Sequence, residues 1–227
     1  MLLPGTGSDE VFVRAVFAGP LRALGVPLIA PPPPPGAALA EGYLATLDAL
    51  ADEHGELLVG GISFGAHLAA EWAVRNPGRC GGLLAALPAW NGVPDSAPAS
   101  HAATLTADLV AGSGVDAALA QTAGSPDWLR AELDRAWRRH GGGLADGLRV
   151  AAGRPAPTRA ELAALAVPAG IGTCTDDPVH PAEVASEWAS ALPRAALGET
   201  TLTALGADRE SLGRATVLAF LRAAQKP

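Results

Sequence analysis

The residues with the clearest capacity for chemistry form the sequence GISFG at positions 61–65, a Gly-x-Ser-x-Gly motif. An apolar run at 56–62 predicts a buried strand before the motif, and an amphipathic segment at 64–75 predicts a helix after it. A serine on so sharp a turn needs small neighbours, which the two glycines supply. Its hydroxyl then lies at a helix N-terminus, where backbone N–H groups favour developing negative charge. We interpret Ser63 as a nucleophile, against the alternative of an ordinary glycine-rich turn.

The two cysteines predict structural thiols and no metal site. Cys80 and Cys174 are too far apart in the sequence for a CxxC motif and too few for a disulfide framework. The loop at 174–180 does combine a cysteine with two aspartates and a histidine. Ligands confined to one short loop rarely complete a coordination shell, so we expect no bound metal there.

Length and composition predict one globular domain. The chain has 227 residues, of which 49% are hydrophobic and 17% charged, and this argues against disorder. No apolar run approaches the roughly 18 residues of a membrane span. The start, MLLPGTGSDE, lacks the basic region and long apolar core of a signal peptide. We therefore expect a soluble, cytoplasmic protein with no membrane partner.

The charge balance argues against a nucleic-acid partner. The chain has 16 basic and 23 acidic residues, a net charge of −7, and Lys226 is the one lysine in the sequence. Without a basic stripe there is little to neutralise a phosphate backbone, so we expect no nucleic-acid binding.

The reactive residues belong to a chain in which strand-length apolar runs alternate with segments of helical period, which is typical of a parallel sheet with crossover helices. The apolar runs predict strands at 1–3, 26–30, 56–62, 82–87, 167–173 and 195–202. One-sided apolar patterns predict helices at 8–24, 36–54, 64–75, 182–192 and 209–224. Five prolines at 31–35 predict a stiff loop after the second strand.

A long segment in the middle of the chain has no strand pattern. Within it, the stretch at 128–140 places Leu129, Leu133, Ala136 and Trp137 on one helical face. We expect a single domain over 1–227, with a helical cap inserted at 89–165.

Three parts of the chain resemble the α/β-hydrolase family: GISFG at 61–65, LLPGTGSDE at 2–10 and TDDPVHP at 175–181. The resemblance implies an α/β fold, a three-layer α/β/α sandwich whose mainly parallel sheet has about six strands. The opening is similar to the family's His-Gly-x-Gly turn, which implies that the backbone N–H groups of Thr6 and Phe64 form an oxyanion hole. The alternative is a phosphate-binding loop or a plain turn, although the opening lacks both the P-loop and the dinucleotide-binding patterns.

The resemblance also implies that the chain starts at the family's third strand and omits the usual antiparallel pair. The strand at 26–30 would then be an exposed edge of the sheet. Pairing across that edge is one route to a homodimer.

In the family, the catalytic acid follows the strand after the cap, where this chain has TDDPVHP. The resemblance puts the acid about four residues before Pro181, so Asp177 fits best and Asp176 competes with it. We expect the other aspartate to cap a helix or shape the loop.

The family's catalytic histidine follows the last strand, but this sequence has no histidine after His180. His180 shares the loop with Asp177 and keeps the order Ser, Asp, His, so it is the strongest candidate for the base. The alternative is a residue that only structures the loop, because the acid and the base normally come from different strand ends.

The other four histidines fit the role of base less well. His54 ends a predicted helix on the side of the sheet away from the motif, and His67 lies one turn into the predicted helix, where packing is its expected role. His101 and His140 lie in the predicted cap and would reach the site only by a particular fold-back.

These residues predict a serine hydrolase, of esterase or thioesterase type, that cleaves a small-molecule carboxylic ester or thioester. Ser63 would attack the acyl carbon, His180 would relay the proton and Asp177 would orient the imidazole, with no cofactor implied. An apolar roof over the acyl group would be formed by tryptophans that are also typical core residues, namely Trp90, Trp128 and Trp137. The alternatives are an inactive binding protein with this fold, or a lyase, cyclase or acyltransferase that uses the same pocket.

Overall fold

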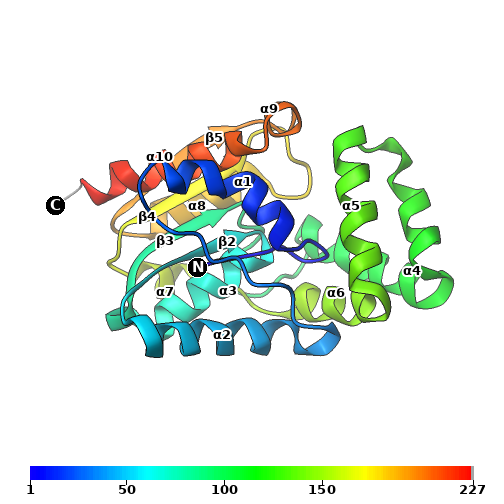
Figure 1. Cartoon of the computed structure of the whole chain (residues 1–227), viewed down its shortest axis with the longest axis horizontal. Helices are drawn as coiled ribbons and strands as arrows, with labels where there is room; N and C mark the ends of the chain where they lie inside the picture. The colour runs from blue at the N-terminus through cyan, green and yellow to red at the C-terminus, as the bar shows by residue number, and fades with distance from the viewer. Residues whose placement is uncertain (226–227) are drawn as a thin grey trace.

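Five of the apolar runs pair into one sheet. In the computed structural model, which describes residues 1–225, the strand order is β1-β2-β3-β4-β5 and every neighbouring pair is parallel (Figure 1). The strands are β1 (Leu2–Leu3), β2 (Leu57–Ile62), β3 (Cys80–Ala86), β4 (Ala169–Cys174) and β5 (Ala195–Thr200). Because all the strands run the same way, their carboxyl ends meet at one edge of the sheet, where ligands bind in open α/β sheets.

Helices cover both faces of this sheet. One layer contains α2 (Leu39–His54), α3 (Phe64–Arg75), α7 (Arg159–Ala163) and α8 (Ala182–Ala191). The other contains α1 (Glu10–Arg22), α9 (Leu202–Ala207) and α10 (Glu210–Ala224). The predicted α/β/α class with a parallel sheet is therefore confirmed. Within residues 1–225, no helix has both the length and the apolar character needed to cross a bilayer.

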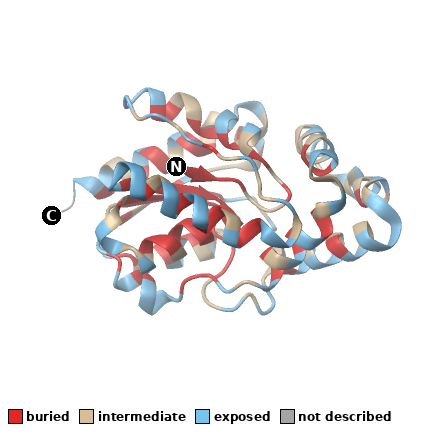
Figure 2. Cartoon of the chain, turned by 60° about the horizontal axis from the view of Figure 1, so that its bottom comes forward, coloured by how far each residue is buried: buried red, intermediate tan, exposed pale blue. Residues whose placement is uncertain are grey.

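The strands divide their side chains between two cores. In β3, Leu83 and Ala85 belong to the core under α2 and α3, whereas Leu84 and Ala86 belong to the core under α1 and α10. This alternation is the period of two that a strand imposes on its side chains. The buried residues accordingly concentrate in the sheet and on the helix faces that cover it (Figure 2).

The strand predicted at 26–30 does not form, so the sheet has five strands instead of about six. The segment makes a backbone hydrogen bond to β1, from Leu2 N–H to Ile29 O at 2.9 Å, without becoming a strand. Pro27 and Pro31 have no N–H group to donate to a ladder, which explains why the pairing stops there. The homodimer was expected to form by pairing across this strand. Because the strand is absent, that route is not available, and dimerisation stays a prediction.

A group of helices connects β3 to β4. It contains α4 (Pro98–Ala120), α5 (Asp127–His140) and α6 (Leu144–Gly153), and it is followed by α7 in the main helical layer. Figure 1 shows α4 and α5 at the end of the molecule opposite the C-terminus. These three helices share a small core of their own, with Trp137, Leu144 and Leu148 among its residues.

Candidate active site

Ser63 forms the turn between β2 and α3. Its φ is 53°, which is a strained conformation for a residue with a side chain. Neighbouring backbone groups hold it: its N–H donates to Ala86 O at 2.8 Å, and its carbonyl accepts the N–H groups of Ala66 and His67 at 2.9 and 3.1 Å. Strain that is held in this way is typical of a functional position.

The motif glycines are required by close approach of the backbone. A Cβ at Gly61 would lie 2.5 Å from the carbonyl carbon of Gly65. A Cβ at Gly65 would overlap the carbonyl oxygens of Leu3 and Pro4. The start of α3 therefore packs directly on the loop that follows β1, and this contact brings that loop to the serine.

Ser63, His180 and Asp177 form a continuous chain of hydrogen bonds. His180 Nε2 lies 2.9 Å from Ser63 Oγ, and His180 Nδ1 lies 2.9 Å from Asp177 Oδ2. The other carboxylate oxygen, Asp177 Oδ1, accepts the backbone N–H groups of Val179 and His180 at 2.8 and 3.1 Å. One oxygen thus shapes the loop while the other binds the ring, so the short loop accommodates both bonds of a Ser–His–Asp arrangement.

The electrostatics of the loop set the protonation states of Asp177 and His180. Burial by itself would raise the pKa of Asp177, but the hydrogen bond and charge of His180, with the two backbone N–H groups, hold that pKa below its usual value. Asp177 is therefore ionised at neutral pH and accepts a hydrogen bond from the Nδ1–H group of His180. The network assigns the Nδ1–H tautomer to His180, so the lone pair of Nε2 faces the Ser63 hydroxyl.

Asp176, the competing candidate for the acid, has a different partner. Its Oδ1 accepts the N–H of Leu202 at 2.6 Å, at the start of α9. Asp176 thus holds the first turn of α9, the segment in which the family resemblance implied a histidine. The two neighbouring aspartates are separated by the structure, one toward a helix and one toward the His180 ring.

His67 is a core residue beside the candidate triad, and the prediction of a packing role is confirmed. Its ring is 2% exposed and lies 4.5 Å from the Trp90 ring and 5.7 Å from the Trp188 ring, centroid to centroid. Its Nε2 accepts the N–H of Ala89 at 2.9 Å. Burial, and then the nearby His180, lower the pKa of His67 to about 3, so its ring is neutral.

The remaining histidines lie elsewhere. His54 is exposed at the end of α2, and His101 is exposed on α4. His140 Nε2 lies 2.8 Å from the carbonyl oxygen of Ser8. Neither His101 nor His140 therefore folds back onto Ser63. The position next to the serine is occupied by His180.

Phe64 directly follows Ser63, and Thr6 lies in the loop after β1 that packs on the start of α3. Phe64 follows the serine in the first turn of α3, where N–H groups have no partner within the helix. Thr6 follows Gly5, at which a Cβ would lie 3.4 Å from Ser63 Cβ. Among the bonds between residues 1–225, neither N–H has a hydrogen-bond acceptor. Two such donors next to a nucleophile can bind a developing oxyanion.

The three tryptophans predicted to line the substrate pocket lie in three different places. Trp90 is 7% exposed in the core under α2 and α3. Trp128 packs near α9, with the Arg209 guanidinium 4.4 Å from its ring centroid. Trp137 lies against the loop after β1, with its Nε1 2.9 Å from the Cβ position of Gly7. The three residues thus belong to three different hydrophobic clusters, and the apolar roof over the acyl group stays a prediction.

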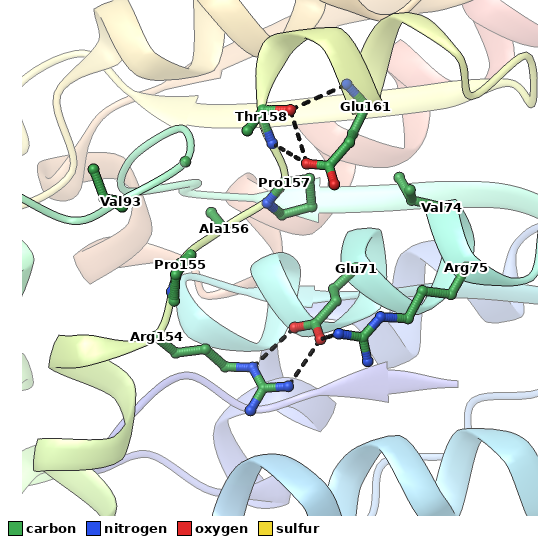
Figure 3. A pocket seen from close by; sticks show the side chains of 11 residues that line it. Glu71, Val74, Arg75, Val93, Arg154, Pro155, Ala156, Pro157, Thr158 and Glu161 are labelled. Atoms are coloured by element: carbon green, nitrogen blue, oxygen red, sulfur yellow. Dashed lines mark hydrogen bonds and ion pairs between the residues drawn. The ribbon is translucent and has the colours of Figure 1, made fainter.

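A cavity of about 470 Å³ lies between α3 and the segment that leads into α7 (Figure 3). Its charged groups bind one another: Arg154 donates to both oxygens of Glu71 at 2.8 and 2.9 Å, and Arg75 also pairs with Glu71. Thr158 and Glu161 form a capping box at the start of α7. None of the residues predicted for the active site lines this cavity.

A charged cluster beside the candidate site was not predicted from the sequence. Asp9 binds Arg135 and Arg139 of α5. The i, i+4 spacing of the two arginines places them on one face of a helix. No signal in the sequence shows that this face lies against the loop after β1, because the partners are more than 120 residues apart.

The structure is similar to solved structures of α/β-hydrolase enzymes. No protein-family model matches the chain, and a search of curated proteins found no match. A thermophilic esterase from Thermogutta terrifontis is 19% identical with a TM-score of 0.65, over 88% of this chain and 78% of the esterase. The α/β hydrolase MGS-M2, from a Medee basin deep-sea metagenome library, is 12% identical with a TM-score of 0.69, over 97% and 88%. The enol-lactonase from Burkholderia xenovorans LB400 is 16% identical with a TM-score of 0.62, over 85% and 79%.

The chain therefore has the α/β-hydrolase fold. The resemblance inferred from its sequence motifs is confirmed at the level of the fold. At these identities the likeness defines the architecture, and the reaction has to be argued from the site itself.

Proposed function

We propose that this protein is a serine hydrolase that cleaves a carboxylic ester or thioester through an acyl-enzyme on Ser63. The observation that carries the proposal is the chain of two 2.9 Å hydrogen bonds from Ser63 Oγ through the His180 ring to Asp177. In this proposal Ser63, His180 and Asp177 are the catalytic residues, and no cofactor takes part. The similarity to an esterase and an enol-lactonase supports a carboxylic ester as the substrate.

In the first half of the reaction, Ser63 Oγ attacks the acyl carbon while its proton moves to His180 Nε2. The charge that develops on the acyl oxygen is held by the N–H groups of Thr6 and Phe64. The ionised Asp177 stabilises the imidazolium that forms and keeps its ring in place. His180 then gives the proton to the leaving alkoxide or thiolate, and the acyl group stays on Ser63.

In the second half, a water molecule replaces the alcohol or thiol. His180 Nε2 takes a proton from that water, whose oxygen attacks the acyl carbon of the ester on Ser63. Collapse of the tetrahedral intermediate releases the carboxylic acid, and the proton on Nε2 returns to Ser63 Oγ. His180 passes one proton in each half-reaction, first from Ser63 to the leaving group and then from water to Ser63 Oγ, so the enzyme ends as it began.

The observations favour this reaction over a binding protein without a base. A loop histidine with no catalytic role would not need its Nε2 directed at the strained serine, 2.9 Å away. Nor would it need an ionised carboxylate, 7% exposed, on its other nitrogen.

Reaction with a fluorophosphonate probe tests the proposal, because such probes react with an activated serine. We expect labelling of the wild type and loss of labelling in Ser63→Ala and His180→Ala, measured by intact mass. His54→Ala is the matched control, since His54 is exposed on the surface, and it should label like the wild type.

The other outcomes lead to different conclusions. Folded wild type that does not react would support the binding-protein alternative. Labelling that is lost in Ser63→Ala but kept in His180→Ala would mean that another group is the base.

A further inference from the structure

The C-terminal half of α5 is bound to residues 7–10, in the loop after β1. Asp9 lies at the centre of this contact, with a side chain that is 1% exposed. Arg135 donates to both of its oxygens, at 2.6 and 2.7 Å, and Arg139 donates to Oδ2 at 2.9 Å. Asp9 Oδ1 also accepts the N–H of Val11 at 3.0 Å and so caps α1. One buried carboxylate thus joins α5 to the start of α1.

Two further contacts from α5 hold the backbone of the same loop. His140 Nε2 donates to the carbonyl of Ser8 at 2.8 Å, an acceptor that assigns the ring proton to Nε2. Trp137 lies against Gly7, at which a Cβ would be 2.9 Å from the indole nitrogen. The Ser8 N–H donates to the carbonyl three residues before it at 3.1 Å, which closes the turn that contains Thr6.

Asp9, Arg135 and Arg139 form a clamp of opposite charges between α5 and the loop after β1. Burial by itself would raise the pKa of Asp9, but the hydrogen bonds and charge of Arg135, and the hydrogen bond of Arg139, hold that pKa below its usual value. The two arginines are held in turn by Glu132 and Glu10. Removing the partners of a buried charge leaves that charge uncompensated, so the surrounding backbone has to move or the group has to be neutralised.

We infer that Asp9, Arg135 and Arg139 are positioning residues that hold the Thr6 N–H in place to bind the oxyanion formed at Ser63. The inference rests on the proposed hydrolase function. In this inference α5 affects the reaction indirectly. The helix touches no reacting atom, but it fixes the loop that provides one of the two N–H donors to the oxyanion.

The size of the effect follows from the role of that donor. Loss of one oxyanion-hole hydrogen bond lowers kcat by about 10²- to 10³-fold in enzymes of this kind. A displaced donor loses part of this, so we expect Asp9→Asn to lower the rate by about 10- to 100-fold. Because the contact forms only in the transition state, kcat should fall while KM stays nearly unchanged.

The test compares three substitutions in the clamp with a matched control. Asp9→Asn keeps the cap of α1 but removes the negative charge. Arg135→Gln removes the arginine that pairs with both oxygens of Asp9. Arg135→Lys keeps the charge with fewer hydrogen bonds and should restore part of the rate. The control is Arg154→Gln, which breaks an equally two-bonded pair with Glu71 at a place that no active-site residue lines.

Two readouts separate positioning from stability. The first is the rate of fluorophosphonate labelling, with kcat and KM for p-nitrophenyl acetate, and the second is the melting temperature of each variant. We expect the Asp9 and Arg135 variants to react more slowly at temperatures where they are fully folded, whereas Arg154→Gln lowers the melting temperature and reacts like the wild type. A variant that fails to fold is replaced by Arg139→Gln, which leaves Arg135 on Asp9.

The outcomes distinguish the inference from the function on which it rests. Wild type that labels, with folded Asp9 and Arg135 variants that label at the same rate, would refute the inference and leave the hydrolase proposal standing. Equal slowing in Arg154→Gln would also refute it, because the effect would then belong to stability. Folded wild type that does not label would refute both.

Discussion

Asp177→Asn is the substitution that separates geometry from protonation most cleanly. The asparagine oxygen can keep the two backbone hydrogen bonds that Asp177 Oδ1 accepts from Val179 and His180. The amide nitrogen then replaces Oδ2, which lies 2.9 Å from His180 Nδ1. An amide NH₂ donates and does not accept, so the ring is driven to the tautomer with its proton on Nε2. In that tautomer His180 cannot take the proton of Ser63.

The expected loss follows from this change of tautomer. A Ser–His–Asp triad whose aspartate is replaced by asparagine loses about 10⁴-fold in kcat while its geometry is kept. At 1.36 kcal/mol for each factor of ten, this corresponds to about 5 kcal/mol of transition-state stabilisation. Stability should change far less, because the loop keeps both of its backbone hydrogen bonds.

The assay is the rate of fluorophosphonate labelling, measured side by side for Asp177→Asn and Asp176→Asn. Asp176 binds the Leu202 N–H through one oxygen, a bond that an asparagine oxygen can also accept, so its variant should label at nearly the wild-type rate. A folded Asp177→Asn variant that labels within about threefold of the wild type would show that the carboxylate does not set the tautomer, and the reasoning would be refuted.

Three further expectations follow from burial and close approach. The pKa of Asp177 is lower in the folded protein than in the unfolded chain. Its contribution to the free energy of unfolding is therefore present above about pH 4 and is lost as the pH falls through the pKa of the folded state. Urea unfolding between neutral pH and about pH 3 measures this loss, and a free energy of unfolding that does not change with pH would contradict it. Gly65→Ala should destabilise the protein by about 1–3 kcal/mol because its Cβ overlaps backbone oxygens, whereas Gly112→Ala in α4, which has open space around it, should be neutral or stabilising in thermal unfolding; equal effects would refute the packing argument. Burial raises the pKa of Cys80 to about 11 and of Cys174 to about 12, so neither thiol should react with a thiol reagent at about pH 8 until the protein unfolds, and fast labelling of native protein would count against this.

The nucleophile turn could be predicted from the sequence because its causes are local. The apolar run, the two glycines and the amphipathic segment after them are consecutive, and together they specify strand, turn and helix. The helix after the turn begins and ends as predicted, at Phe64 and Arg75. The strand at 26–30 was wrong for an equally local reason, since Pro27 and Pro31 interrupt the donors that a strand needs.

The role of His180 could be proposed from the sequence but not decided. Whether three residues of loop can satisfy both bonds of the ring depends on how Asp177 divides its two oxygens between backbone and imidazole. That division is a property of the folded loop, and so is the turn of Asp176 toward α9.

Contacts between segments that are far apart in the chain could not be predicted from the sequence. A pattern of apolar residues on α5 predicts the helix, but it does not show which face meets residues 7–10. For the same reason Asp9 was missed, and the distribution of the three tryptophans among three clusters was not foreseen.

The most direct measurement is the capture of the acyl-enzyme. Wild type is mixed with a p-nitrophenyl ester, the reaction is stopped in acid after the first turnovers, and the digested peptides are weighed by mass spectrometry. We expect the mass of the acyl group on the peptide that contains Ser63, and its absence in Ser63→Ala. Ester hydrolysis by the wild type with no acyl group on that peptide, or with the group on another residue, would contradict the role assigned to Ser63.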